Sequence, residues 1–444
     1  MREDERAKGV APTGDTMRNE LKTTCWGRNR KVIDSFISLS IVQFANYLAP
    51  LITLPYLFRV LGPAKFGLVE LARVITVYFL LLTDYSFSLS ATREISIRRN
   101  DPARVSEVFS AVLVLRFLLV VLSAAILSVV VWTVPKLRAD WPVYYLSFVH
   151  VLGMWLFPVW LFQGLEQMKP IATLNVAAKT LVIAGIFVLV RNEEDYLYVP
   201  LLQSSGAVVV GMAGLVIALS RFGVRFRMPP TAVLRREFLD GWHLFVSKMA
   251  TTMYTTSNTV ILGLFTDLTF VAYYAAGDKI VRAVQGLQLP LSQAIFPHIG
   301  RLASQSRQAA LVYAGKIVRL VSVATLAMSA GLFFGAPYIT RAVQGQPSTE
   351  GTAVIRILSA LPFIIGLSNI FGIQVLVNFG REKTLTKVLL TAGVLNIALA
   401  MVLVLPLKHV GVAIAAVTTE AFVTIALFVA MRRSGLDIFR ATQQ

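Results

Sequence analysis

Long apolar blocks alternate with short polar turns along this chain of 444 residues. Many of the blocks exceed about 18 residues and carry few charges, which is typical of helices that cross a membrane. The strict alternation of polar and apolar positions that membrane β-barrel strands require is missing from the blocks. We therefore predict an all-α integral membrane protein.

The blocks predict twelve transmembrane helices in two six-helix bundles. The longest basic connection lies near the middle of the spanning region and divides the bundles. The helices are expected over 33–58, 68–97, 104–133, 141–164, 170–190, 196–220, 237–264, 270–299, 308–335, 352–378, 384–406 and 409–431. The predicted units are a polar tail (1–32), an N-terminal lobe (33–220), a basic linker (221–236), a C-terminal lobe (237–432) and a second tail (433–444).

Composition and charge support this interpretation and orient the chain. The sequence is 56% hydrophobic and 15% charged, whereas soluble domains are about a quarter charged. If both tails are cytoplasmic, the cytoplasmic segments hold 26 Lys or Arg residues and the external loops hold 7. Cationic loops stay on the cytoplasmic side, so both termini are predicted there. The same rule explains the net charge of +18 without a nucleic-acid partner.

Charged residues also fall inside the predicted spans, where each costs roughly 2.5–3.5 kcal/mol on insertion scales. Their spacing places several on polar helix faces of the second, seventh and eighth spans, the first span has a similar uncharged polar face, and Arg116 lies deep in the third. Such faces either meet around a central, water-filled cationic cavity or pair separately in isolated interhelical hydrogen bonds. We expect the cavity, with four cations as its substrate-binding residues: Arg73, Arg116, Lys248 and Arg282.

Three carboxylates share these spans and leave two roles open. Asp84, Asp278 and Glu420 could couple transport to a proton or another cation, because carboxylates inside membranes often relay protons. Their alternative role is to neutralise nearby arginines. A cationic cavity would in either case attract an anion, and guanidinium groups suit phosphate oxygens.

Motifs for catalysis are missing from the sequence. There is no G-x-x-x-x-G-K-[ST] loop for ATP and no H-E-x-x-H zinc motif, and the four histidines have no metal spacing. One cysteine, Cys25, excludes an intramolecular disulfide. We expect a transporter and neither an enzyme nor a protein with a cofactor or metal. The polar turn WLFQGLEQMKP (160–170) is expected to be a tight reversal without a catalytic role.

Four stretches resemble the polysaccharide transporter family, the Wzx-type flippases of O-antigen and exopolysaccharide within the multidrug/oligosaccharidyl-lipid/polysaccharide exporter superfamily. The resemblance covers about residues 33–440, and Ser86 replaces the glycine that usually follows the Asp-Tyr pair in this family. The stretches are LPYLFRVLGPAKFG (54–67), LLTDYSFSLSATREI (81–95), WLFQGLEQMKP (160–170) and NTVILGLFTDLTFVAYYAAGDKIVRAVQGLQLPLSQAIFPHI (258–299).

The resemblance implies a flippase of the bacterial inner membrane. Its substrate would be an oligosaccharide on undecaprenyl diphosphate, moved from the cytoplasmic to the periplasmic leaflet by alternating access. A polymerase and a chain-length regulator of the same pathway would be further partners, beside the lipid bilayer. One alternative is a drug or cation antiporter of the same superfamily, which would be expected to have an acidic cavity. The other is a membrane-embedded polysaccharide-assembly enzyme, which would be expected to have a large external loop. A peptidoglycan-precursor flippase would usually have fourteen helices.

Overall fold

The computed structural model describes residues 50–441, apart from the side chains at positions 240, 243, 247, 250, 254, 440 and 441. The predicted tail 1–32, most of the predicted first helix 33–58 and residues 442–444 lie outside this range. The described chain is helical and contains no strand. Eight of its helices are long and apolar enough to cross a membrane, as expected of a multi-pass membrane protein.

The helices follow one another with short connections. A first helical stretch covers 50–84. It is followed by α2 (Phe87–Ile97), α3 (Pro102–Thr133), α4 (Pro135–Arg138), α5 (Trp141–Leu156), α6 (Val159–Gly164), α7 (Lys169–Leu189), η1 (Glu193–Leu197) and α8 (Tyr198–Arg221). The second half contains α9 (Thr231–Phe265), α10 (Leu268–Gly286), α11 (Leu289–Gln305), α12 (Arg307–Gln344), α13 (Thr349–Leu358), α14 (Leu361–Asn369), η2 (Ile370–Val377), α15 (Glu382–Arg433) and α16 (Ile438–Ala441).

Two of the long stretches are helical hairpins. The stretch 50–84 turns at Gly62, whose φ is +67°, and the Phe58 and Phe66 ring centroids on either side lie 5.3 Å apart. The helix α15 turns at Lys408, where φ is 49° and ψ is −128°. In a straight helix Asn396 and Thr419 would be about 35 Å apart. Their side-chain oxygens lie 3.3 Å apart, so the two halves of α15 pack side by side.

Four predicted helices are interrupted. The predicted helix 68–97 breaks at Tyr85 and Ser86, which both have positive φ, and 141–164 breaks at Phe157 and Pro158 because proline disfavours α conformation before it. The predicted helix 270–299 divides into α10 and α11, with Pro290 near the start of α11. The predicted helix 352–378 divides into α13, α14 and η2. Prolines that begin α11 and α14 fit the first turn of a helix, where no backbone donor is needed.

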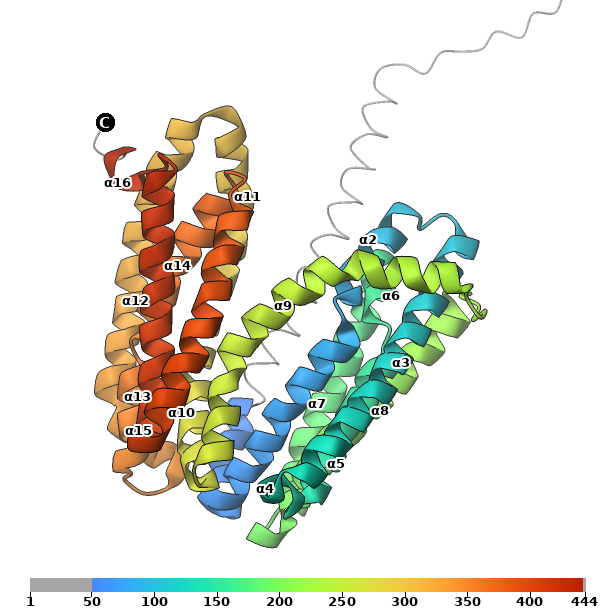
Figure 1. The fold of residues 1–444 in the computed structure, drawn as a ribbon, viewed down its shortest axis with the longest axis horizontal. Helices are drawn as coiled ribbons and strands as arrows, with labels where there is room; N and C mark the ends of the chain where they lie inside the picture. Colours follow the sequence, from blue (N-terminus) through green and yellow to red (C-terminus); the bar gives the residue numbers. More distant parts are fainter. Residues whose placement is uncertain (1–49, 442–444) are drawn as a thin grey trace, which may run out of the picture.

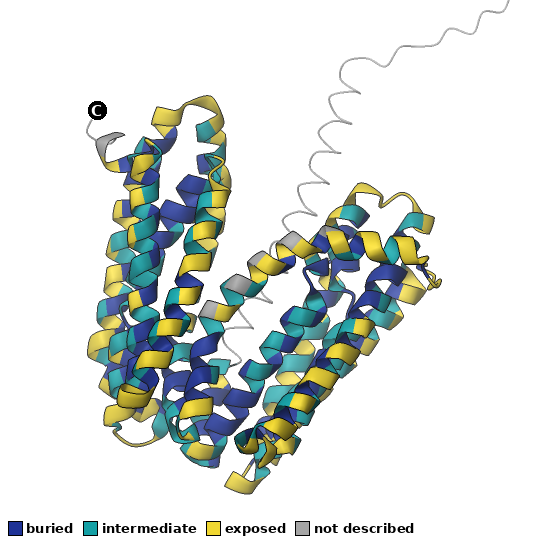
Figure 2. Ribbon diagram, viewed as in Figure 1, coloured by how far each residue is buried: buried dark blue, intermediate teal, exposed yellow. Residues whose placement is uncertain are grey.

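The helices form two groups that meet at one end and diverge toward the other (Figure 1). One group contains 63–84 and α2–α8, and the other contains α10–α16. The helix α9 packs against α2 and α3 in the first group and against α10 and α15 in the second. Exposed residues recur along the outer faces of both groups (Figure 2), and many of them are large and apolar, as lipid-facing positions require.

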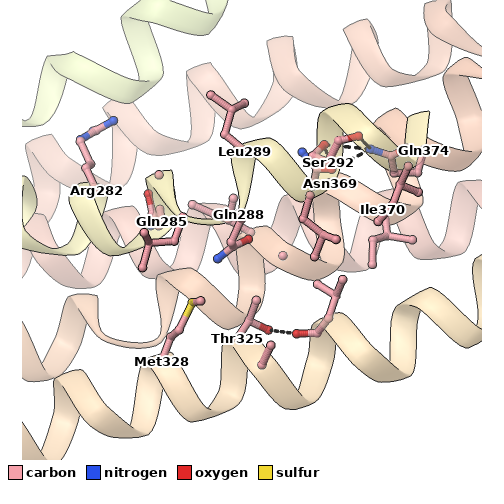
Figure 3. A pocket seen from close by; sticks show the side chains of 18 residues that line it. Arg282, Gln285, Gln288, Leu289, Ser292, Thr325, Met328, Asn369, Ile370 and Gln374 are labelled. Atoms are coloured by element: carbon pink, nitrogen blue, oxygen red, sulfur yellow. Dashed lines mark hydrogen bonds between the residues drawn. The ribbon is translucent and has the colours of Figure 1, made fainter. Parts of the chain in front are cut away.

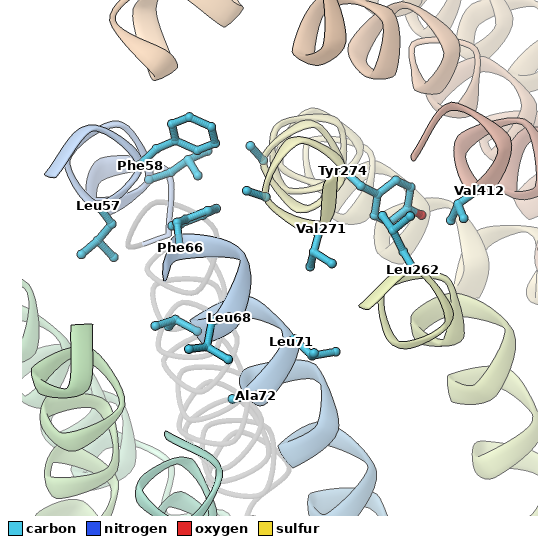
Figure 4. Close-up of a cluster of buried hydrophobic side chains, with 14 of the residues drawn as sticks. Leu57, Phe58, Phe66, Leu68, Leu71, Ala72, Leu262, Val271, Tyr274 and Val412 are labelled. Carbon is cyan, nitrogen blue, oxygen red and sulfur yellow. The ribbon is translucent and has the colours of Figure 1, made fainter. Parts of the chain in front are cut away.

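The groups meet through a continuous apolar core (Figure 4). The aromatic rings of Phe58 and Tyr273 have centroids 6.1 Å apart. Only glycine fits at position 67, because a Cβ there would lie 1.9 Å from the carbonyl oxygen of Leu268 at the start of α10. This close approach of backbones sets how the first group packs on α10.

Candidate functional site

A buried carboxylate connects the two helix groups. Glu70, on the helix 63–84, is buried and accepts the Arg73 Nε–H at 2.8 Å. It also accepts from the ammonium of Lys279 on α10. Lys279 in addition lies 5.4 Å from the centre of the Phe66 ring. One carboxylate therefore balances two cations from opposite groups.

A second pair joins α9 to the end of the helix 63–84. Lys248 Nζ lies 2.8 Å from Asp84 Oδ2. The other oxygen of Asp84 accepts from the hydroxyl of Ser88, one turn later in the chain. The carboxylate is thus fixed from both sides, while the ammonium is the more exposed member of the pair.

A third pair lies on α10, and α9 holds it in place. Arg282 Nε lies 2.6 Å from Asp278 Oδ2, at a spacing of four residues on one helix face. The same guanidinium donates through Nη2 to the carbonyl of Thr255 at 2.8 Å. Glu420 on α15 also contributes to the electrostatic environment of Arg282. Asp278 directly precedes Lys279, so the Glu70 and Asp278 pairs are neighbours along α10.

Arg116 is placed differently from the other predicted cations. It is buried inside the first group, where it donates to the carbonyls of Thr83 at 3.3 Å and Met154 at 2.8 Å. Its guanidinium carbon lies 4.8 Å from the centre of the Trp160 ring. Within the described residues it forms no salt bridge, and its Nη1 has no hydrogen-bond partner. In this structure the side chain connects the helix 63–84, α3 and α5, and it is buried.

The remaining three predicted cations are half exposed and lie on the helix 63–84, on α9 and on α10. The side chains of Arg73, Lys248 and Arg282 are 42%, 45% and 46% exposed. A cation in this position needs water, a counter-ion or a polar ligand. The described residues contain no cluster of His, Cys, Asp and Glu that could hold a metal. The arrangement suits exchange of a paired carboxylate for an anionic ligand.

Two features of this region were not among the predicted site residues. The link from Glu70 to Lys279 was signalled only by the position of both charges within predicted spans. The second feature is a cavity of about 400 Å³ that starts at Arg282 and whose lining includes the amide side chains of Gln285, Gln288, Asn369 and Gln374. The nearest sequence signal for it was Gln285, three residues after Arg282 on the same helix face.

A buried amide cluster fixes α9 against α15. The Asn396 amide donates to Asn258 Oδ1 at 2.9 Å and to the Ser257 hydroxyl at 3.3 Å. Thr419, from the second half of α15, donates to Asn396 Oδ1. Because buried polar groups need partners, this cluster sets the rotation of α9 about its own axis and hence the directions of Lys248 and Thr255.

Comparison with known proteins assigns the family. The family described as "Polysaccharide biosynthesis protein" matches residues 32–303. A protein of Escherichia coli (strain K12) is 32% identical over 401 residues, which cover 90% of this chain and 96% of that protein. A protein of Shigella dysenteriae is 28% identical over 402 residues, which cover 90% and 99%. Both relatives carry the name "Putative O-antigen transporter".

Solved structures share the fold at low sequence identity. The lipid II flippase MurJ, in an inward closed conformation, has a TM-score of 0.68 and 11% identity over 93% of this chain and 90% of that chain. An inward-facing multidrug resistance transporter of the MATE family has a TM-score of 0.63 and 14% identity over 92% and 99%. The family predicted from the sequence motifs is therefore confirmed: this chain belongs to the polysaccharide biosynthesis protein family and has the fold of the MurJ and MATE transporters.

Proposed function

We propose that the protein is a flippase. It moves an oligosaccharide linked to undecaprenyl diphosphate from the cytoplasmic to the periplasmic leaflet of the bacterial inner membrane, for O-antigen or exopolysaccharide synthesis. Its relatives are named as transporters and not as enzymes, which places the activity in transport. The observation that carries the proposal is the set of half-exposed cations Arg73, Lys248 and Arg282, on the helices 63–84, α9 and α10, each paired with a carboxylate.

The proposed architecture has twelve spanning helices in two six-helix lobes. Two of the eight apolar spans contain the turns at Gly62 and Lys408 and so count twice. The helix α9 and the pair α10–α11 add two more, since the charges of the site lower their hydropathy. With the cation-rich loops in the cytoplasm, both termini are cytoplasmic and the helix groups diverge toward the cytoplasm. This is the inward-open state of an alternating-access cycle.

Substrate binding proceeds by exchange of partners. The diphosphate takes the place of Asp84 at Lys248 and of Asp278 at Arg282, because a phosphate offers more acceptor oxygens than one carboxylate. Arg73 binds the same anion or the first sugar, and Arg116 acts indirectly by holding Thr83 next to Asp84. The lipid tail stays in the bilayer while the head crosses.

The exchange also gives the carboxylates a role. Asp84 and Asp278 lose their cationic partners when the diphosphate binds, and Glu420 on α15 interacts electrostatically with the same Arg282. Carboxylates inside membrane proteins often relay protons. Proton uptake at these residues would couple the inward-open and outward-open states to a proton gradient.

The proposal is tested by complementation of a strain that lacks its own flippase. Arg282→Ala and Lys248→Ala are each expected to abolish polymer output while the protein remains at normal level in the membrane. Lys316→Ala is a matched control, because this exposed lysine lies on α12 and forms no ion pair among the described residues. Normal polymer output from both site variants would overturn the proposal.

A further inference from the structure

The cavity beside Arg282 lies inside the second helix group. It measures about 400 Å³ and is lined by α10, α11, α12, α14 and η2. Figure 3 shows Arg282 at one end and Gln374 at the other, with Gln285 and Gln288 between them. The cavity therefore extends from the proposed phosphate-binding cation into the helix group.

Uncharged polar side chains line the cavity. They are held by hydrogen bonds: Gln374 Nε2 donates to Ser292 Oγ at 2.8 Å, Ser292 Oγ donates to Asn369 Oδ1 at 2.9 Å, and Gln288 Nε2 donates to the Pro362 carbonyl at 3.0 Å. In these bonds the amide N–H groups are directed into the protein. The amide oxygens of Gln288 and Gln374 are left over for other donors.

Gln374 carries a buried polar atom that lacks a partner. The residue is 1% exposed, yet its Oε1 has no hydrogen-bond partner among the described residues. It lies in η2, a stretch of π-helix, and π-helical turns are frequent at functional sites. A buried amide oxygen without a donor costs free energy, which a ligand with hydroxyl groups would recover.

The lining also selects the class of ligand. No carboxylate lines the cavity and Arg282 stands at its end, so a cation is disfavoured. Sugar hydroxyls can donate to Gln374 Oε1 and accept from the amide of Gln285, which forms no hydrogen bond within the described residues. The apolar walls, including Leu289 and Met328, suit the C–H faces of a sugar ring. The volume is within the range of roughly 300–1,000 Å³ typical of small-molecule sites.

We infer that this cavity is a sugar subsite, which binds the sugar next to the diphosphate of the transported lipid and so contributes to substrate specificity. The inference rests on the proposed function, because it takes the diphosphate to be bound at Arg282. The first sugar is directly attached to the diphosphate. With the phosphate at the end of the cavity, the sugar is the part of the substrate that reaches the glutamines.

The test compares two lipids on the purified full chain in nanodiscs: undecaprenyl diphosphate, and the same lipid carrying the oligosaccharide that accumulates in the deletion strain. Wild type is expected to bind the sugar-bearing lipid more tightly. Gln285→Leu, which breaks no internal hydrogen bond, should weaken binding of the sugar-bearing lipid about tenfold and leave sugar-free undecaprenyl diphosphate unchanged. Gln374→Leu should have the same effect on both affinities, provided that its thermal unfolding matches wild type. The control Gln203→Leu, on α8, should change the affinity for neither lipid.

The outcomes separate the two proposals. Arg282→Ala should weaken the binding of both lipids, and an unchanged affinity for both would contradict the proposed function. Equal affinity of wild type for the two lipids would overturn the sugar subsite while leaving the phosphate site intact. If Gln285→Leu lowered the affinity for both lipids equally, at an unchanged unfolding temperature, the subsite would also be overturned, because that residue would then act on the phosphate site.

Discussion

Lys248 on α9 donates to Asp84 on the helix 63–84, with Nζ 2.8 Å from Oδ2. The pair joins two helices from different halves of the sequence, and its cation is the more exposed partner. In the proposed mechanism the Asp84 carboxylate holds the Lys248 ammonium in place until the substrate diphosphate replaces the carboxylate. The pair is then a part of the binding reaction and not only a structural contact.

The two partners should therefore respond differently to mutation. Lys248→Ala should abolish polymer output, and the double variant Lys248→Ala/Asp84→Ala should not restore it, because the phosphate-binding cation is still missing. Asp84→Asn should retain partial output, since Lys248 remains free to bind. Output in the flippase-deficient strain measures the effect, with membrane levels checked by immunoblot. Full recovery in the double variant would show that Asp84 and Lys248 only neutralise each other.

The buried Glu70–Lys279 pair is expected to control stability. Glu70→Ala leaves Lys279 and Arg73 without their shared carboxylate and should lower the free energy of unfolding by roughly 3–5 kcal/mol. The double variant Glu70→Gln/Lys279→Gln removes the charges on both sides and should recover more than half of that loss. Denaturant unfolding in detergent measures both.

A surface pair provides the comparison for this prediction. Lys65 and Asp140 are 3.7 Å apart and partly exposed, so Lys65→Ala should cost less than about 1 kcal/mol. If Lys65→Ala and Glu70→Ala cost the same, the buried pair does not join the helix groups as described.

Ser86 is expected to be a strained residue. Its φ is 64°, in the left-handed region that favours glycine, and its buried hydroxyl has no partner among the described residues. Ser86→Gly should raise the free energy of unfolding by about 1 kcal/mol, because glycine adopts this conformation without steric cost. Ser90→Gly, inside α2, is the matched control and should lower stability by roughly 0.5–1 kcal/mol. A decrease in both variants would argue against strain at Ser86.

The meeting end of the helix groups should open when its cationic contacts are removed. Arg59 donates to the carbonyls of Ala342 and Val343 at the end of α12, and Lys136 donates to the Thr266 carbonyl at the end of α9. Helix C-termini favour cations, so both contacts hold this end closed.

Spin-label distances across this end provide the measurement. Arg59→Ala is expected to shift the population toward longer distances. The loss of one or two hydrogen bonds should raise the ratio of open to closed molecules by up to about tenfold. Arg138→Ala is the control, because Arg138 stacks on Trp132 within its own group. Identical distance distributions in Arg59→Ala and wild type would remove Arg59 from the closure of this end.

Much of the fold was accessible from sequence because membrane helices are set by local hydropathy. The spans, the turn at 160–170 and the charged faces all follow from patterns within one helix. The predicted turn is present, and Glu166 adopts φ of 57° as the helix α6 ends. Some breaks inside the apolar blocks were harder to predict from sequence. At Tyr85 and Ser86, for example, neither residue type signals a break, because their left-handed conformation is imposed by the packing around them.

The partners of the charged residues could not be predicted from one sequence. Which carboxylate meets Lys248 or Lys279 depends on the rotation and tilt of two helices, and neither is encoded locally. The same limit applies to Arg116, because its contact with the Trp160 ring could not be predicted from its depth in a span. The amide-lined cavity depends on five elements at once and left only Gln285 as a visible signal.

The central claim, that these cations carry a lipid diphosphate across the membrane, is tested most directly by flipping in proteoliposomes. Vesicles would contain the lipid-linked oligosaccharide from the deletion strain, and a membrane-impermeant periodate treatment would oxidise only sugars on the outer leaflet. Wild type is expected to expose nearly all of the lipid over time, whereas Arg282→Ala/Lys248→Ala should stop at the half already outside. Equal and complete oxidation by wild type and the double variant, or no oxidation beyond half by wild type, would contradict the account.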